Sequence, residues 1–386
     1  MAKQNKPDIR FKGFTDAWEQ RKLGDNIVEY TEVTTENNQY PPLTSSRKGI
    51  FLQTEYFAGN QIASDDNTGY NIVPYGYFTY RHMSDDEVFH FNINDIVEKG
   101  IVSTLYPVFT TDENLDSRYL QYQLNYGHEF AKFAILQKQG GSRTYMYLNK
   151  LRQLHLTMPN HVEEQKAISS FFMNLDHLIT LHQRKYDKLQ VLKKAMLEKM
   201  FPKNGSSVPE IRFKGFTDAW EQRKLGALCV EFKSGDFISA SDIAENEAYP
   251  VYGGNGLRGF TNHYNHDGEY ALIGRQGALC GNVNYAVGKS YFTEHAVAVR
   301  ANKTNQTRFL YYLFSTMNLG QYSGQSAQPG LAVGNLVELE NVVPSKPEQE
   351  KIASFLSSLD HLITLHQREL EKLQNIKKSM LEKMFV

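Results

Sequence analysis

Cysteine is scarce in this chain, and long apolar runs are missing. The two cysteines, Cys229 and Cys280, lie far apart without a C-x-x-C spacing, which fits a reducing compartment and argues against a cysteine zinc site. The N-terminal residues lack the apolar segment of a signal peptide, and no stretch of about 18 apolar residues occurs. We therefore expect a cytoplasmic protein without a membrane span.

Net charge is also nearly absent. The 42 Lys and Arg residues almost balance the 43 Asp and Glu residues, for a formal charge of −1. Any surface for nucleic acid must therefore be local, with acidic faces elsewhere. A length of 386 residues is too great for one ordinary core and suits about two or three domains.

Two segments occur twice. The stretch "IRFKGFTDAWEQRKLG" fills residues 9–24 and returns unchanged at 211–226, while "LDHLITLHQR" fills 175–184 and returns at 359–368. The copies lie much further apart than the roughly 20 to 50 residues of a solenoid repeat. The chain is therefore organised as two tandem halves, each with a constant front, a variable body and a constant rear.

The rear segments predict two long helices, over residues 164–200 and 348–384. The first segment contains no proline or glycine, and a seven-residue recurrence with charges between indicates a coiled-coil seam. Each helix would be ~55 Å long, enough to act as a ruler between two domains. The seam residues are Ile168, Leu175, His182, Leu189 and Met196 in the first copy, and Ile352, Leu359, His366, Leu373 and Met380 in the second.

Two of these seam residues are histidines near the helix midpoints. If the helices pair antiparallel and centred, His182 and His366 meet, and such a pair is at least partly neutral at pH 7 because two protonated rings repel. The alternative is that each is a core histidine without a partner.

The bodies predict strand-rich domains with short helices. Runs such as "YNIVPYGYFTY" and "EYALIGRQG" combine β-branched and aromatic residues with Gly and Asn turns. The expected fold is mixed α+β with a pseudo-two-fold plan. Two α/β domains, residues 1–160 and 205–346, are joined by two long antiparallel coiled-coil helices, 161–204 and 347–386.

Several short motifs resemble catalytic or ligand sites but lack their context. "GGNGLRG" has glycine spacing of a dinucleotide loop without a following helix, and "AVGKS" lacks the first glycine of a P-loop. "YPPL" has the wrong residues on both sides of its prolines for a methyltransferase motif. A metal at His263, His266 and Glu269 is the weaker alternative to local hydrogen bonds. Nucleophile, base and oxyanion site do not assemble, so we expect no catalysis on this chain.

Polar loops of the bodies place basic residues among aromatics and glycines. Arg pairs with guanine and Asn or Gln with adenine, while Ser, Thr and Lys suit phosphates. The alternative is that these loops are ordinary solvated turns. The candidate DNA-contacting residues are Ser45, Ser46, Arg47, Lys48, Tyr80, Arg81, His82, Ser142, Arg143, Tyr145, Gly254, Asn255, Arg258, Arg275, Gln276, His295, Gln325 and Gln328.

The whole pattern resembles the specificity (S) subunit of Type I restriction-modification enzymes. The resemblance rests on the duplicated "FTDAWEQRKLG" fronts, on "YPVYGGNGLRGF", "ALIGRQGALCGNV", "TEHAVAV" and "GQSAQPGLAVGNL" in the second body, and on the helix entries "HVEEQKAISSF" and "KPEQEKIASFL". It spans nearly the entire chain, and the first body departs most from the family's glycine-rich pattern.

The resemblance implies a non-catalytic subunit of an adenine-N6 DNA methyltransferase and Type I endonuclease complex. Two target recognition domains would each read one half of a split double-stranded DNA sequence, separated by the antiparallel helices. Two methyltransferase subunits and two restriction/translocase subunits would bind the chain. S-adenosylmethionine, ATP and Mg²⁺ are then expected on the partner subunits, with no cofactor on this chain.

The repeats have a reason under this interpretation. Identical fronts and rears present one docking surface to identical partners, since a two-fold arrangement of partners needs a pseudo-two-fold adaptor. Recent duplication alone explains the identity but not the divergence of the bodies. Two other functions stay open: a stand-alone DNA-binding regulator, which would bind its site tightly without partners, and a coiled-coil scaffold that binds no nucleic acid.

Overall fold

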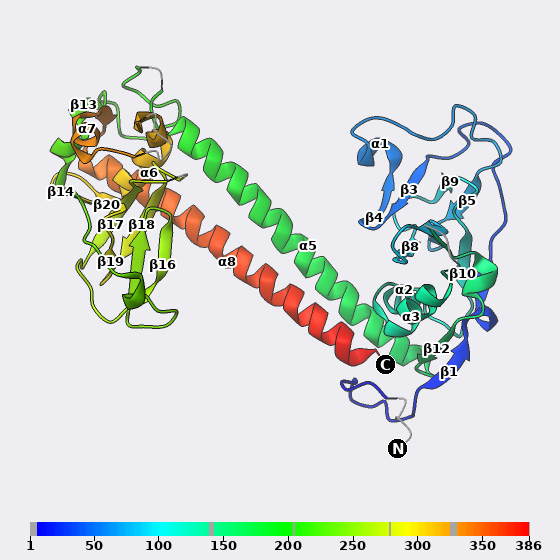
Figure 1. Ribbon diagram of the computed structural model, residues 1–386. Helices are drawn as coiled ribbons and strands as arrows, with labels where there is room; N and C mark the ends of the chain where they lie inside the picture. The colour runs from blue at the N-terminus through cyan, green and yellow to red at the C-terminus, as the bar shows by residue number, and fades with distance from the viewer. Residues whose placement is uncertain (1–5, 139–142, 204, 278, 325–329, 386) are drawn as a thin grey trace. The chain divides into compact units, whose positions relative to one another are not determined.

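The chain forms two compact units. The structure is a computed structural model that describes residues 6–138, 143–203, 205–277, 279–324 and 330–385. The first unit is Met1–Leu181 with Glu369–Val386, and the second is His182–Arg368. The long helices α5 (Val162–Lys199) and α8 (Lys346–Met384) each contribute to both units (Figure 1). Among the helices of the described ranges, none has the length and apolarity to cross a membrane.

The first unit is built mainly from short strands and from the four short helices α1 to α4 around the first body. Its further elements are β1 (Glu19–Lys22), β2 (Ile27–Glu29), β3 (Leu43–Ser46), β4 (Gly49–Leu52), α1 (Gln53–Tyr56), β5 (Asn71–Pro74), β6 (Phe78–Thr79), β7 (Met83–Ser84), β8 (Asn92–Ile93), β9 (Lys99–Val102), β10 (Val108–Thr111), α2 (Ser117–Tyr126), α3 (His128–Leu136), β11 (Thr144–Tyr145), α4 (Leu148–Leu151) and β12 (His155–Met158).

The second unit has longer strands and fewer of them. Its further elements are β13 (Glu221–Lys224), β14 (Cys229–Ser234), β15 (Tyr249–Gly253), β16 (Gly256–Thr261), β17 (Glu269–Gly274), β18 (Val283–Val287), β19 (Tyr291–Phe292), β20 (Ala296–Ala301), α6 (Thr307–Thr316), α7 (Val333–Glu338) and β21 (Glu340–Val343).

The main sheets of the two units have the same strand order. The order is β2-β10-β6-β8 in the first unit and β14-β20-β17-β18 in the second. The strand that comes last in the sequence, β10 or β20, therefore lies between the two that come first in the sequence. The predicted mixed α/β fold with two long helices is confirmed. The short helix expected over "SRYLQYQLNYGHEFAKFAI" is divided at Gly127 into α2 and α3, and the one expected over "TRFLYYLFSTM" is α6. Both α2 and α6 follow the last strand of their sheet in the sequence.

The alternation of side chains along β17 explains its place at the centre of the second sheet. Ala271 and Ile273 pack in one apolar cluster with Phe309 of α6, while Tyr270 and Leu272 belong to a separate cluster. Successive residues of a strand point to opposite faces of the sheet, so a strand buried on both faces must be apolar throughout, as "YALI" is.

Each front repeat joins its body to the end of a long helix. β1 pairs with β12 and β13 pairs with β21, both antiparallel. The amide of Ile9 donates to the carbonyl of Lys383 at 3.0 Å, and that of Ile211 donates to Lys199 at 2.9 Å. The repeat therefore satisfies a carbonyl in the last turn of a helix, which otherwise lacks a partner.

The same repeat carries a buried ion pair. Arg212 donates from Nε and Nη2 to Glu348 at 2.7 and 2.8 Å, and Arg10 makes the same two contacts to Glu164 at 2.5 and 2.7 Å. Both glutamates lie in the first turn of a long helix, where the helix dipole favours a carboxylate. The front repeat thus anchors the beginning of one helix and the end of the other within each unit.

The bodies contact the rear repeats at matched positions. The Tyr122 hydroxyl donates to Asp176 at 2.6 Å and the Tyr312 hydroxyl donates to Asp360 at 2.7 Å. Each aspartate also accepts from a lysine of the other long helix, Lys377 or Lys193.

A second matched contact fixes the start of each body helix. The Gln165 side chain accepts from the amide of Asp116, the cap of α2, and that of Gln349 accepts from Gln306, the cap of α6.

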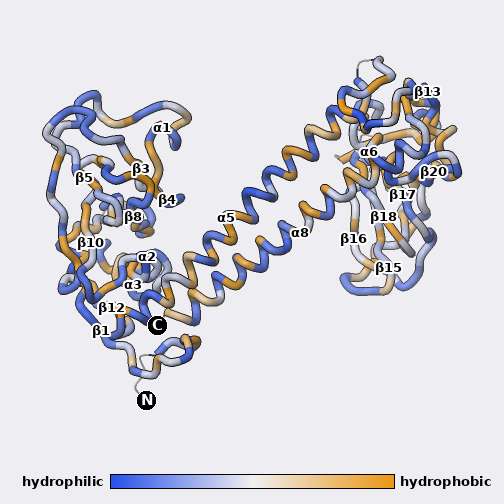
Figure 2. Tube along the Cα trace, turned by 180° about the vertical axis from the view of Figure 1, so that it is seen from behind, coloured by the Kyte–Doolittle hydropathy of each residue, from blue (hydrophilic) through white to orange (hydrophobic). Residues whose placement is uncertain are grey.

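The long helices pair antiparallel through the predicted seam. In the first unit Ile168 and Leu175 share a cluster with Leu373 and Met380. In the second unit Leu189 and Met196 share one with Ile352 and Leu359. Figure 2 shows hydrophobic segments recurring between hydrophilic ones along both helices. The helices begin at Val162 and Lys346, two residues earlier than predicted. In α8 the earlier start places Pro347 in the first turn, where proline is tolerated.

The two seam histidines meet, as the centred antiparallel pairing predicts. The Nδ1 atoms of His366 and His182 lie 3.1 Å apart and the ring centroids 5.1 Å apart. One ring nitrogen must donate and the other accept, so at least one of the two rings is neutral.

Candidate nucleic-acid interface

In the second unit a tight hairpin presents the turn Gly254-Asn255. Gly253 pairs with Gly256 across this two-residue turn between β15 and β16. Gly256 has a φ of 96°, in the left-handed region that glycine tolerates best. A Cβ on Gly254 would lie 3.1 Å from the carbonyl oxygen of His295. Glycine therefore lets the turn pack closely on the loop before β20.

This turn lies beside the ends of other strands. A cavity of about 450 Å³ is lined by the hairpin, by the loop after β17 and by the loop before β20. Five of its six lining residues are among the predicted DNA contacts; the lining consists of Gly254, Asn255, Arg258, Gln276, Gly277 and His295. The structure thus brings together donors and acceptors from three separate stretches of sequence, and Asn255, Arg258 and Gln276 are exposed.

Arg275 has a different position from the one predicted. Its Nε donates to the carbonyl of Leu331 at 3.3 Å, and its Nη1 donates to the hydroxyl of Ser234 at 3.4 Å. Its backbone amide donates to His295. The side chain is half-buried, and its guanidinium donates hydrogen bonds to neighbouring segments. Arg275 therefore holds the loop beside the cavity but does not line the cavity itself. Gln325 and Gln328 lie outside the described residues.

The first unit has an equivalent hairpin with different residues. Ser46 pairs with Gly49 across the turn Arg47-Lys48, between β3 and β4, and Gly49 also has a positive φ, 124°. Four predicted residues, Ser45, Ser46, Arg47 and Arg81, line a cavity of about 270 Å³. Arg81 is exposed and follows β6, as Arg275 follows β17.

An acidic turn pairs with the cations around this cavity. Asp85, Asp86 and Glu87 follow β7 and accept from three basic residues: Arg143 Nε donates to Asp85 at 2.9 Å, Arg47 Nη1 donates to Asp86 at 2.8 Å, and Lys138 contacts Glu87. The hydrogen bond from Arg47, and then that from Ser84, lowers the pKa of Asp86. Sequence reasoning selected Arg47 and Arg143 but missed the carboxylates facing them.

The aromatic candidates of the first unit divide into buried and exposed residues. Tyr80 is fully buried and its hydroxyl donates to the carbonyl of Met146 at 2.9 Å, so the prediction that it contacts DNA is wrong because the ring belongs to the core. His82 is also buried and contacts the carbonyl of Leu105. Its ring stacks on the exposed Tyr147, with centroids 5.0 Å apart. Tyr145 is exposed beside them, and Ser142 lies outside the described residues.

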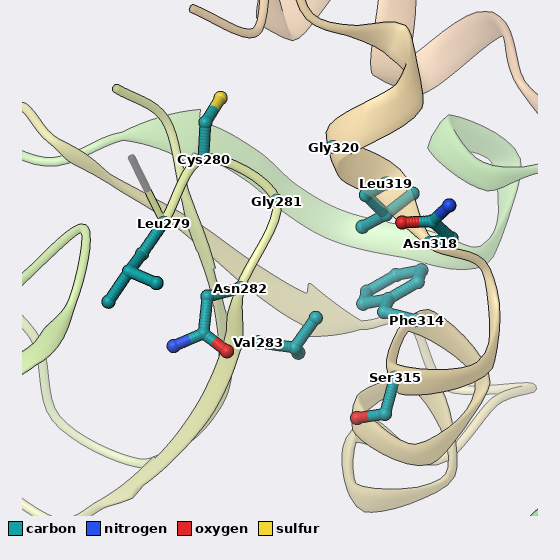
Figure 3. A pocket seen from close by; sticks show the side chains of 10 residues that line it. All are labelled: Leu279, Cys280, Gly281, Asn282, Val283, Phe314, Ser315, Asn318, Leu319 and Gly320. Atoms are coloured by element: carbon teal, nitrogen blue, oxygen red, sulfur yellow. The ribbon is translucent and has the colours of Figure 1, made fainter. Parts of the chain in front are cut away.

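A further cavity of the second unit holds no catalytic set among its described lining residues. It lies between residues 279–283 and the segment from Phe314 to Gly320 (Figure 3). Its one ionisable side chain is Cys280, whose thiol donates to the carbonyl of Arg275 at 3.2 Å. Burial raises the pKa of this thiol, which disfavours the thiolate that a nucleophile requires.

The histidines considered for a metal make local hydrogen bonds. His266 contacts Glu231 at 3.1 Å through Nε2 and Asn265 at 2.7 Å through Nδ1, while His263 contacts Asn262 at 2.9 Å. Within the ranges that the structure describes, no group of three or more His, Cys, Asp or Glu side chains is placed to hold a metal ion.

Comparison with known proteins shows which family part of the chain resembles. Residues 217–375 match the family described as Type I restriction modification DNA specificity domain. This segment of the chain is therefore similar to a DNA specificity domain of that family. All six residues lining the cavity beside the Gly254-Asn255 turn lie within the matched segment. The domain also includes α6, α7 and most of α8.

Individual relatives carry related names. The Type I restriction enzyme EcoprrI specificity subunit of Escherichia coli is 45% identical over 146 residues, which are 37% of this chain and 36% of that protein. The chain thus spans little more than a third of this relative. The MjaVIII specificity subunit of Methanocaldococcus jannaschii is 22% identical over 316 residues, covering 74% of this chain and 73% of the relative.

The fold is shared over the full chain with a solved structure. The S subunit of a Type I restriction-modification system from M. genitalium has a TM-score of 0.60 and 17% identity, covering 99% of both chains. At this identity the likeness concerns the fold alone.

Proposed function

We propose that this chain is the non-catalytic DNA sequence-specificity subunit of a Type I restriction-modification complex, and that each unit reads one half of a bipartite target. One observation carries the proposal. In both units one cavity is lined by a two-residue hairpin turn and by the loop that follows the third strand of the main sheet. This strand is β6 in the first unit and β17 in the second. The same frame therefore presents two different sets of side chains.

The difference between the sets suits two different half-sites. The first unit offers Arg47 and Arg81, whereas the second offers Asn255, Arg258 and Gln276. Arg reads guanine in the major groove and Asn or Gln reads adenine, so an unchanged frame with exchanged side chains has a changed base preference. The near-zero net charge leaves much of the phosphate neutralisation to partner subunits.

The rear repeats support docking of identical partners. Leu178 and Leu181 of α5 are 40% and 39% exposed, and the corresponding Leu362 and Leu365 of α8 are 39% and 44% exposed. Apolar side chains at matched repeat positions suit two copies of one partner. In this role two methyltransferase and two restriction subunits bind the chain in the cytoplasm, and S-adenosylmethionine, ATP and Mg²⁺ are held by those partners.

The test is the methylation pattern of a host that expresses this chain with its methyltransferase subunit. We expect adenine-N6 methylation at one split motif, and a change in only one half of that motif when Arg258 is replaced with Ala. Tight, sequence-specific binding by the chain alone, without any methylated motif, would instead identify a stand-alone DNA-binding regulator. Absence of both would leave only the scaffold role.

A further inference from the structure

Phe237 is a solvent-exposed aromatic side chain in the segment that follows β14 of the second unit. It is 76% exposed, more than any other aromatic side chain in the described part of the chain. The adjacent Ile238 is buried with Val251 and Tyr291. The packing of Ile238 therefore fixes the segment on one side and leaves the Phe237 ring on the other.

The backbone around Phe237 is held on both sides. The amide of Asp236 donates to Phe292 at 3.0 Å, and the amide of Glu294 donates to Asp236 at 3.1 Å. The hydroxyl of Tyr291 donates to the carbonyl of Phe237 itself at 2.8 Å. The ring is thus presented from a well-fixed backbone, so little conformational entropy is lost when a ligand contacts it.

Gly235 allows this close packing. A Cβ at this position would lie 2.0 Å from the carbonyl oxygen of Phe292, a distance that no side chain tolerates. The glycine therefore brings the segment carrying Phe237 directly against the strand that leads to His295.

The segment that carries Phe237 and the polar cavity both lie beside β19 and the residues that follow it, up to His295. Asp236 bridges to Thr293 on one side of this strand, and the amide of Thr293 donates to Tyr252 of β15 at 2.9 Å on the other. His295, two residues further, lines the cavity with Asn255 and Arg258. The aromatic ring and the polar side chains therefore lie beside the same short segment, 292–295.

We propose that Phe237 contacts the C5-methyl group of a thymine in the major groove, at a position next to the bases read by the polar cavity. The inference rests on the proposed function. The thymine methyl is the one apolar group that base pairs present in the major groove, and Phe is among the side chains that contact it. Arg, Asn and Gln beside the ring also match major-groove acceptors and donors. Insertion of the ring between base steps is the competing mode, which belongs to minor-groove binders.

The experiment replaces each thymine of the methylated motif, one at a time, with deoxyuridine, which lacks only the methyl group. The assembled complex with its methyltransferase subunit is titrated on each duplex by fluorescence anisotropy. One buried methyl contributes ~0.8 kcal/mol, so we expect about three- to fivefold weaker binding at one thymine. Phe237→Ala should bind the thymine and deoxyuridine duplexes equally at that position, and Phe237→Leu should keep part of the difference.

The matched control is Val230→Ala. Val230 is 70% exposed in β14 of the same unit, and this variant should keep the full difference between thymine and deoxyuridine. If the parent complex prefers its motif to unrelated DNA but deoxyuridine weakens binding nowhere, or weakens it equally in Phe237→Ala, the Phe237 proposal is wrong while the proposed function stands. If the complex shows no preference for any motif, the proposed function fails first.

Discussion

His182 and His366 are joined through their Nδ1 atoms, 3.1 Å apart, at the centre of an otherwise apolar seam. Burial, and then the charges of His182 and Lys185, lowers the pKa of His366. A polar pair at one seam position specifies register at some cost in stability. The pair thus favours one alignment of α5 with α8, because a shift by one heptad would set each imidazole against an aliphatic residue.

This pairing predicts that stability falls as the pH drops below about 6.5, the ordinary pKa of histidine. The pKa of His366 is lower in the folded chain than in the unfolded one, so the unfolded chain takes up the proton first and protons favour unfolding. Melting temperatures measured from pH 8 to pH 5.5 should fall less for His366→Leu than for the parent chain. The exposed His361 provides the control, since His361→Leu should retain the parent's pH dependence. Equal losses in the parent and His366→Leu would contradict the prediction.

The buried pair of Arg212 and Glu348 predicts a large loss of stability when one partner is removed. The Glu348 side chain is 1% exposed, and Arg212→Met leaves its carboxylate buried without a counter-ion. We expect the free energy of unfolding in urea to fall by about 3–5 kcal/mol. Arg10→Met should act similarly through Glu164. Arg223→Met breaks an exposed pair with Glu221 and should change stability by less than about 1 kcal/mol. A comparably small loss for Arg212→Met would refute the anchoring role.

The acidic turn of the first unit predicts competition with DNA phosphates. Replacing Asp85 and Asp86 with Asn releases Arg143 and Arg47, so binding to duplex without the target motif should strengthen. Each released cation that meets a phosphate adds ~0.9 to the slope of log affinity against log salt. The slope should therefore steepen by up to about 1.8 for the double variant.

A charge-matched variant separates this competition from a general effect of charge. Asp65→Asn with Asp66→Asn removes the same two charges from an exposed segment of the same unit. It should leave the salt slope close to that of the parent. Equal changes in the two double variants would mean that overall charge, and not release of Arg47 and Arg143, controls binding.

Arg258 and Arg275, which lie in and beside the cavity of the second unit, should behave differently when replaced. Arg258→Ala should weaken binding to the motif by about 1–3 kcal/mol and relax one base position, with little effect on unrelated DNA. Arg275→Ala removes hydrogen bonds to Leu331 and Ser234, so it should lower the melting temperature as well as the affinity. Binding titrations and thermal unfolding of both variants provide the comparison. If Arg275→Ala weakened binding to the motif alone and left the melting temperature unchanged, Arg275 would contact a base directly, as the sequence predicted.

The long helices and their central pair could be predicted because a seven-residue period is a local signal. Leu175 and Leu373, like Leu189 and Leu359, lie at equal distances along the chain from the two histidines, so centred antiparallel pairing follows from the numbering. The helix starts were predicted two residues too late, and in α8 the observed start places Pro347 within the first turn.

The contact residues could be predicted only in part, because their orientation depends on long-range packing. Five predicted residues do line the second cavity, where glycines and a hairpin turn give a local signal. Tyr80 and Arg81 are adjacent in sequence just after β6, yet the first is buried in the core and the second is exposed. Phe237 was missed because its exposure depends on hydrogen bonds to residues 291–294, more than fifty positions away.

The contacts of Tyr122 with Asp176 and of Tyr312 with Asp360 bear on how such a chain evolves. Each joins a variable body to a residue of the invariant rear repeat. A new body needs a tyrosine in its helix and a strand to pair with the front repeat, whatever its loops contain. A whole body exchanged between the repeats would therefore find the same contacts on the helices and on the front repeat, which would need no substitutions to accept it.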